Sequence, residues 1–308
     1  MQTGSTRPTL FDSDLIAQRR DRADRCSFAG RGDFLHGEVA NLIAERLAEV
    51  TRSFDDALVI GSGGGLHADA LAGRVKTIRQ IEWSPARARQ AGIEATRHSD
   101  TLPVEPESHD LIVSALELHW ANDPVGQLIQ MRRALRPDGL MIAAMFGGQT
   151  LAELREVLAR AEVEVSGGLS PRIAPMGEIR DLGGLLQRAG LAMPVADSER
   201  LPVTYANARA LMHDLRAMGE TSILSERRRA TWSKGMLRRI EEVYALDHPA
   251  PDQRIRATFE IVFLTGWAPA PDQPVALRPG SAKARLADAL AVPEISAGEK
   301  AGPGSGTD

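Results

Sequence analysis

The chain has 308 residues, of which 43% are hydrophobic and 25% are charged, and this composition is typical of an ordinary globular protein. Its formal charge of −4 gives no support to nucleic-acid binding through bulk electrostatics. Cys26 is the only cysteine, which excludes an internal disulfide framework and a cysteine-based zinc site. No apolar run approaches the roughly 20 residues that span a bilayer, and residues 1–8 lack an apolar export segment. We therefore expect a cytoplasmic protein without an integral membrane segment.

The amino-terminal part of the chain is polar and then rich in arginine. We expect residues 1–9 to be disordered. The arginines between residues 14 and 29 favour a solvated helix face over a binding patch. From Val39 to Val50 the apolar residues recur at helical spacing, so we expect a helix that leads into the first strand.

A glycine-rich bend follows the first apolar run of the chain. Leu58–Ile60 predicts a buried strand, Gly61, Gly63 and Gly65 predict a tight turn, and the spacing after Leu66 predicts a helix. Glycine permits positive φ angles and lets the backbone approach a ligand closely. This is the opening unit of a nucleotide-binding α/β domain, although a glycine-rich turn that binds nothing is the open alternative.

A carboxylate ends the second predicted strand. The stretch from Val75 to Pro85 predicts this strand, and Glu82 lies about where an α/β nucleotide fold places the acid that binds both ribose hydroxyls. The alternative is that Glu82 caps the helix beginning near Pro85. The two roles can coexist.

Polar and aromatic side chains follow the third predicted strand. Residues 110–116 form an almost uninterrupted apolar run, as a doubly covered parallel strand requires. Glu117, His119 and Trp120 come directly after it, and ligands in open α/β sheets lie outside the carboxyl ends of strands. Residues 124–135 predict a helix, residues 137–139 a turn, and residues 140–146 another buried strand.

The second half of the chain completes one main domain, which we place at residues 10–268. Thr150 and Glu153 predict a capping box at the start of a helix. Late strands are expected at 195–201 and 259–267, with a helical insertion at about 207–247 between them. Residues 269–308 are rich in Pro, Gly and Ala and predict a flexible tail.

The order of these motifs resembles the class I S-adenosylmethionine-dependent methyltransferases. Residues 118–123, Leu-His-Trp-Ala-Asn-Asp, are similar to the branch that includes the malonyl-carrier-protein methyltransferases of biotin synthesis. Blocks at 144–151, 167–173 and 214–220 resemble the respiratory complex I assembly factor family. Members of that family are described as hydroxylating an arginine on the quinone-site iron–sulfur subunit of complex I. The resemblance implies a Rossmann-like α/β fold: a seven-stranded, mostly parallel sheet with helices on both faces and a helical insertion.

The resemblance also implies a cofactor, S-adenosylmethionine. The glycines would line its methionine portion and Glu82 would hold its ribose. Two positions depart from the family pattern, because Val59 and His98 stand where acids are common. Losing a hydrogen bond to a charged group costs about 1.5–3 kcal/mol, so we expect the cofactor site to be weak.

The candidate site residues fall into three groups. His119 is the candidate catalytic base, and its alternative role is a histidine packed against Trp120 and hydrogen-bonded to the backbone. The candidate residues for the substrate side are Trp120, Met145, Phe146 and Arg172. The candidate cofactor-binding residues are Gly61, Ser62, Gly63, Gly65, Glu82, Trp83, His98, Ser99 and Ala115.

Three functions compete. The first is modification of an arginine on a protein substrate, a complex I subunit, by hydroxylation. The second is methyl transfer to a small acid or a carrier-protein thioester. The third is a non-catalytic assembly chaperone with a degenerate cofactor site, which would bind its partner through the insertion, the 167–175 loop and an exposed Trp232. Hydroxylation normally needs a metal or flavin, but the seven histidines lack metal-ligand spacing, so we predict no metal site.

Overall fold

The computed structural model describes residues 9–25, 34–96, 100–274 and 286–293. Two compact units divide the chain, Met1–Ala270 and Pro271–Asp308. In the second unit the described residues include one short helix, α10 (Leu286–Leu290). The predicted disorder of residues 1–9 and much of the predicted flexible tail fall outside the described residues. No helix in the described ranges is long and apolar enough to cross a membrane.

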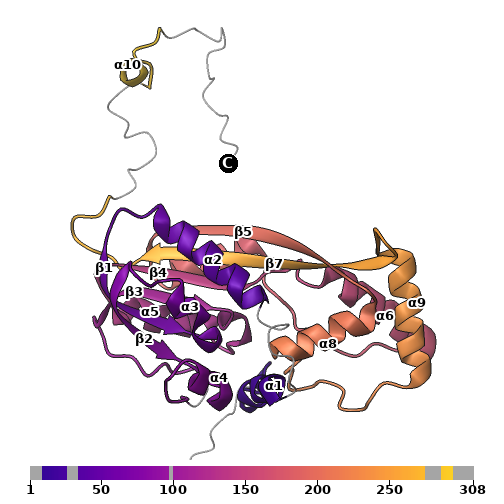
Figure 1. Ribbon diagram of the computed structural model, residues 1–308. Coiled ribbons are helices and arrows are strands. Elements are labelled where there is room, and N and C mark those ends of the chain that lie inside the picture. The colour runs from indigo at the N-terminus through magenta and orange to yellow at the C-terminus, as the bar shows by residue number, and fades with distance from the viewer. Residues whose placement is uncertain (1–8, 26–33, 97–99, 275–285, 294–308) are drawn as a thin grey trace, which may run out of the picture. The chain divides into compact units, whose positions relative to one another are not determined.

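The first unit contains a seven-stranded sheet with helices around it, which confirms the predicted α/β class (Figure 1). Four neighbouring strands, in the order β2, β1, β3, β4, are parallel. The other three strands join through antiparallel pairs, with β7 between β4 and β5 and with β6 beside β7. The strands are β1 (Phe54–Ile60), β2 (Val75–Ile81), β3 (His109–Ala115), β4 (Leu135–Phe146), β5 (Ala192–Tyr205), β6 (Pro249–Ala250) and β7 (Arg254–Trp267).

Helices cover both faces of the sheet because neighbouring strand residues point to opposite sides. In β4, Phe146 packs into a hydrophobic cluster with Val39 of α2, whereas Met145 packs into a second cluster with Leu128 of α5 and Leu186 of α7. The helices of this unit are α1 (Asp14–Arg25), α2 (Phe34–Ala48), α3 (Leu66–Asp69), α4 (Pro85–Gln90), α5 (Pro124–Ala134), α6 (Ala152–Ser166), α7 (Ile179–Arg188), α8 (Ala208–Met218) and α9 (Lys234–Asp247). Two short 3₁₀ turns lie at Gly63–Gly65 and Leu118–Trp120.

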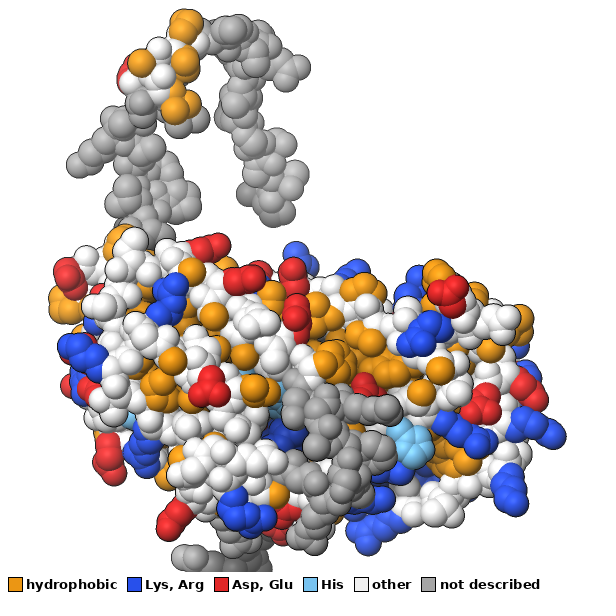
Figure 2. All heavy atoms as spheres, in the orientation of Figure 1, with side chains coloured by type: hydrophobic (Ala, Val, Ile, Leu, Met, Phe, Trp, Pro, Cys, Tyr) orange, Lys and Arg blue, Asp and Glu red, His pale blue; other side chains and the backbone are white. Residues whose placement is uncertain are grey.

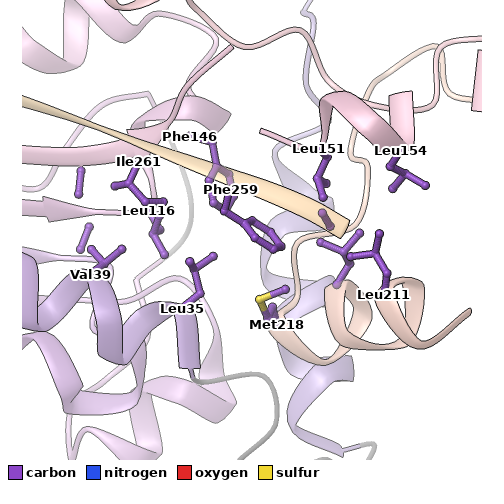
Figure 3. Packing of buried hydrophobic residues seen from close by; sticks show 14 of the residues in the cluster. Leu35, Val39, Leu116, Phe146, Leu151, Leu154, Leu211, Met218, Phe259 and Ile261 are labelled. Carbon is purple, nitrogen blue, oxygen red and sulfur yellow. The ribbon is translucent and has the colours of Figure 1, made fainter. Parts of the chain in front are cut away.

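The two long strands β5 and β7 run past the parallel strands toward α9 (Figure 1). Between them in sequence lie α8 and α9, which correspond to the predicted helical insertion. Phe259 of β7 and Leu211 of α8 are fully buried. Figure 3 shows Leu151, Leu154 and Leu211 lying between α6 and α8, near Phe259. This packing places the insertion beside the carboxyl end of β4.

Local differences from the predicted elements have physical causes. The capping box at Thr150 and Glu153 is wrong, because Thr150 Oγ1 donates to Glu260 O and Glu153 accepts from Thr258. Leu151, in the left-handed region, takes the N-cap position instead. The helix after the glycine turn has only four residues, Leu66–Asp69. Strand β4 begins before the predicted turn, but its register with β3 shifts there, and Asp138 has a φ of +61°.

Candidate functional site

The glycine turn connects β1 to α3 and lies against the carboxyl end of β3. Gly61 has a φ of +83°, and a Cβ there would lie 2.5 Å from Ala115 O and 2.6 Å from Glu117 Oε1. A Cβ on Gly63 would lie 2.9 Å from His67 Cε1. Any residue other than glycine would therefore be strained and would collide with neighbouring atoms. The turn permits close packing of the chain's own groups around a buried site.

Glu82 fixes the end of β2 to the glycine turn. Its Oε2 accepts hydrogen bonds from Ser62 N (3.1 Å) and Ser62 Oγ (2.8 Å), and its Oε1 accepts from the amides of Trp83 (2.9 Å) and Ser84 (3.0 Å). Burial opposes ionisation of Glu82, but Arg20, Arg87 and these hydrogen bonds outweigh it and lower its pKa. Ser84 Oγ is the group that caps α4, so Glu82 supports the cap through the Ser84 amide.

Arg20 reaches from α1 into the same buried region. Only 1% of its surface is exposed, so the predicted solvated face is wrong for this residue. Its guanidinium forms an ion pair with Glu117, and it lies 3.8 Å from Glu82 Oε1 and 3.6 Å from Glu220 Oε1. Burial alone would lower the Arg20 pKa, but the three carboxylates raise it. We call Arg20 and these three glutamates the carboxylate cluster.

Glu117 is the carboxylate of the cluster that accepts a proton most readily. Burial, together with repulsion from Glu82 and Glu220, raises its pKa to about 7 against the opposing effect of Arg20. Trp83 Nε1 donates to Glu117 Oε2 at 2.9 Å, which orients the carboxyl group. One guanidinium among three acids leaves an excess of negative charge that suits a cationic group.

Glu220, directly after α8, lies beside the two aromatic residues that follow β3. Trp120 Nε1 donates to Glu220 Oε2 at 2.9 Å, and His119 Nε2 lies 3.4 Å from the same oxygen. The other oxygen, Oε1, is buried and accepts no hydrogen bond within the described structure. Burial opposes ionisation of Glu220, but the hydrogen bond to His119 and the charge of Arg20 outweigh it and lower its pKa. Glu220 Oε1 is thus paired with Arg20 at 3.6 Å but can still accept a hydrogen bond.

His119 packs against Trp120, as one of the two roles considered from the sequence requires. Its ring packs 4.8 Å from that of Trp120 and 4.5 Å from that of Phe146, measured between centroids. Its hydrogen-bonding partner is Glu220 rather than the backbone. Burial lowers the His119 pKa, so the ring is neutral at pH 7.

A cavity of about 690 Å³ opens beside this group. Trp120, Phe146, Arg172 and Glu220 line it, together with apolar residues of α6 and α8. Met145 does not, because it points to the opposite face of the sheet from Phe146. Three of the four candidate substrate residues therefore meet at one cavity. His98 and Ser99 lie outside the described residues.

Arg20, Glu117 and Glu220 are absent from the sequence-derived candidates. Arg20 is four residues after Ile16 and three before Ala23, both buried, and this helical spacing is the signal that marks it as inward-facing. Glu117 belongs to the polar group after β3, and its place there was the available signal. For Glu220 the sequence offers only its position at the end of the 214–220 block. Within the described ranges, no group of three or more His, Cys, Asp or Glu side chains is arranged to hold a metal ion.

Comparisons with known proteins identify the family of the chain. Residues 58–143 match the family model described as a methyltransferase domain. The zebrafish (Danio rerio) arginine-hydroxylase NDUFAF5, mitochondrial, is 33% identical over 91% of this chain and 89% of its own length. The mouse (Mus musculus) protein of the same name is 34% identical over 97% and 90%. A malonyl-[acyl-carrier protein] O-methyltransferase of Laribacter hongkongensis is 31% identical over 84% and 90%.

Solved structures share the fold. The YcgJ protein of Bacillus subtilis has a TM-score of 0.51 at 15% identity and covers 76% of this chain and 100% of its own. The [4+2]-cyclase SpnF has a TM-score of 0.50 at 15% identity and covers 85% and 98%. The chain has a Rossmann-like class I methyltransferase fold, and it belongs to the family of S-adenosylmethionine-dependent methyltransferase-like enzymes that includes NDUFAF5 and the malonyl-[acyl-carrier protein] O-methyltransferases.

Proposed function

We propose that S-adenosylmethionine binds between the glycine turn and the carboxylate cluster. The donor set suits the cofactor by charge: Arg20 would pair with its carboxylate and Glu117 with its ammonium group. Glu82 would accept from the ribose hydroxyls in exchange for the hydrogen bonds that it now accepts from Ser62. Gly61, Ser62, Gly63, Gly65, Trp83 and Ala115 would surround it. When bound, the cofactor supplies a sulfonium centre that carries a transferable methyl group.

The proposed weakness of this site stays a prediction. Val59 is fully buried in the sheet core and offers no carboxylate, and nothing is described around His98. Glu117 lies beside Gly61 and offers a carboxylate from the neighbouring strand. The cofactor carboxylate must draw Arg20 away from Glu117 to bind, and this exchange also weakens the apparent affinity.

We further propose that the substrate is an arginine of a complex I subunit, the quinone-site iron–sulfur subunit, and that the modification is hydroxylation. Dioxygen and a two-electron reductant from outside the protein would be the co-reactants, with one oxygen atom entering a C–H bond of the arginine and the other leaving as water. The observation that carries this proposal is the buried Glu220 carboxylate, which lines the cavity and has an oxygen without a hydrogen-bond donor. A guanidinium is the side chain best matched to a carboxylate in a partly buried site. Relatives at 33–34% identity are named arginine-hydroxylase.

Each residue of the cavity would have a defined task. Glu220 would bind the target guanidinium, while Trp120 and His119 hold Glu220 in place. Phe146 and the apolar side chains of α6 would cover the methylene groups of the target arginine and exclude water from them. His119 lies behind Trp120 and Phe146, which line the cavity, and its buried Nδ1 has no hydrogen-bond partner in the described structure, so its task would be to position Glu220.

The test is mass spectrometry of the candidate subunit after incubation with the protein and S-adenosylmethionine in a cell extract. We expect one oxygen atom to be gained at a single arginine. Glu220→Gln should abolish the gain, while Glu226→Gln, an exposed control, should retain it. An unmodified subunit with the wild-type protein would contradict the proposal.

Methyl transfer to a small acid or a carrier-protein thioester is the second candidate. It is favoured by the arginines that line the cavity, which suit a carboxylate substrate, and by the malonyl-[acyl-carrier protein] O-methyltransferase relatives. Radioactive methyl transfer to such an acceptor would support it. Subunit binding that survives loss of cofactor binding would support the chaperone alternative. A cytoplasmic location also stays a proposal, and the NDUFAF5 relatives are named mitochondrial.

A further inference from the structure

Six arginines line the cavity. They come from four segments: α1, the loop before α7, α8 and the connection from α8 to α9. Figure 2 shows basic side chains gathered over the end of the first unit where α8 and α9 lie. We call the six arginines that line the cavity the arginine rim. They are Arg19, Arg172, Arg216, Arg227, Arg228 and Arg229.

Internal carboxylates neutralise only part of the arginine rim. Arg172 and Arg228 share one acid, with distances of 2.7 Å and 3.3 Å to Glu162 Oε1. Arg227 lies 3.7 Å from Asp12. For the remaining three, Arg19, Arg216 and Arg229, no carboxylate lies within 4.0 Å in the part of the chain that the structure describes. The only acid among the described lining residues is Glu220.

The unpaired arginines repel one another. Burial lowers the Arg19 pKa, and the nearby charges of Arg227, Arg22 and Arg216 lower it further. The Nε atoms of Arg19 and Arg172 are buried and donate no hydrogen bond within the described structure. Like charges and unused donors at a cavity are relieved when an anionic ligand binds.

The size of the cavity indicates what the ligand is. Its volume of about 690 Å³ lies in the range of sites for drug-sized ligands, and much of its wall is apolar, including Leu154, Met212 and Trp232. A single arginine side chain would fill only part of it. A single small acid would reach only part of a rim that is built from four segments. An extended peptide places several side chains along such a rim.

We propose that the arginine rim binds acidic residues that flank the target arginine, so that the substrate is a segment with an arginine between aspartates or glutamates. This inference rests on the proposed function, because it takes Glu220 as the site of the target guanidinium. The substrate thus makes two kinds of charge contact with the cavity: its arginine contacts Glu220, and its acidic residues contact the rim. Selection of the target would come from this alternating charge.

The test compares two synthetic peptides by calorimetric titration. One has a central arginine flanked by aspartates, and the other has asparagines in place of the aspartates. We expect the aspartate peptide to bind wild-type protein about tenfold more tightly, and the difference to shrink as salt is raised. The double variant Arg216→Gln/Arg229→Gln should bind both peptides equally. A matched double variant of exposed arginines away from the cavity, Arg133→Gln/Arg188→Gln, should retain the preference.

Each outcome has a distinct meaning. Equal binding of both peptides to the wild-type protein would overturn the inference, as would an undiminished preference in Arg216→Gln/Arg229→Gln. Binding of malonate at the rim without binding of either peptide would also overturn it. The rim variant Arg216→Glu/Arg229→Glu should prefer a lysine-flanked peptide, which a merely unfolded protein cannot do. The protein could prefer the aspartate peptide in the titration and yet leave the subunit unmodified in the mass-spectrometric test. That result would support the inference and contradict the proposed hydroxylation.

Discussion

The carboxylate cluster and the arginine rim meet at one cavity, which Glu220 and the six arginines line, and their charges are balanced in different ways. In the cluster, Arg20 is held by three glutamates, and all four side chains are buried. In the rim, Arg216 and Arg229 are exposed and have no ion-pair partner in the described structure. Buried charges must be compensated inside the protein because their desolvation is costly, whereas exposed charges can be left for a ligand. Glu220 links the two regions, because it is the member of the cluster that lines the cavity.

Removal of the central cation should have the largest effect. Arg20→Met leaves three buried carboxylates without their counter-ion, and we expect a loss of about 3–5 kcal/mol in unfolding free energy. The loss should shrink at mildly acidic pH, because the uncompensated carboxylates then have raised pKa values and accept protons in the folded state. Urea denaturation at two pH values measures both effects.

The control for Arg20→Met is Arg160→Met. Arg160 forms exposed ion pairs with Glu164 and Asp247, so its loss should change the unfolding free energy much less than the loss of Arg20 does. Equal stability of the two variants would mean that Arg20 does not compensate the charge of the buried glutamates.

Gly61→Ala should have the next largest effect. The left-handed backbone and the collision with Ala115 O and Glu117 together cost about 2–4 kcal/mol. Gly37→Ala in α2 is the matched control, since nothing lies within 4 Å of its added Cβ, and it should be neutral or slightly stabilising. Thermal unfolding of both variants compares them, and a Gly61→Ala protein as stable as Gly37→Ala would contradict the described packing of the turn.

The unfolding free energy should fall at acidic pH, because two histidines are buried without a proton. Burial lowers the pKa of His67 to about 4 and that of His36 well below its ordinary value. The unfolded chain binds these protons first, so the stability is fully present above pH 6.5 and is lost as the pH falls toward 4. At pH 5, His67 alone should account for about 2 kcal/mol. His67→Gln should flatten the unfolding free energy between these pH values, and an unchanged pH profile would exclude His67 as the cause.

The smallest effect concerns Glu162, which clamps two arginines of the rim. Glu162→Gln should cost about 1 kcal/mol of stability at pH 7, because its hydrogen bonds to Ser170 and Arg172 persist only in weakened form. The same change frees Arg172 and Arg228, so the aspartate peptide should bind several-fold more tightly. Weaker peptide binding in this variant would show that Glu162 positions the rim rather than competing with the ligand.

The sequence predicts the fold better than it predicts the site. Continuous apolar runs mark β1, β3 and β4 because strands covered on both faces need such residues. Glu82 was found because it ends a strand at a characteristic place. Arg20 was misread, since charge on a helix usually faces solvent, and only its buried partners from distant strands reveal its role. Glu220 contacts Trp120, a hundred residues away, and no local pattern encodes that contact.

The most direct test of the central claim is a calorimetric titration with S-adenosylmethionine. The account predicts saturable binding of one molecule per chain to the wild-type protein. Affinity should fall about ten- to a hundredfold in Glu82→Gln, which loses a charged acceptor. It should not change in Glu199→Gln, an exposed control on β5. No binding at millimolar ligand, or equal affinity in the wild-type protein and Glu82→Gln, would contradict the assignment of the cofactor to the glycine turn and the carboxylate cluster.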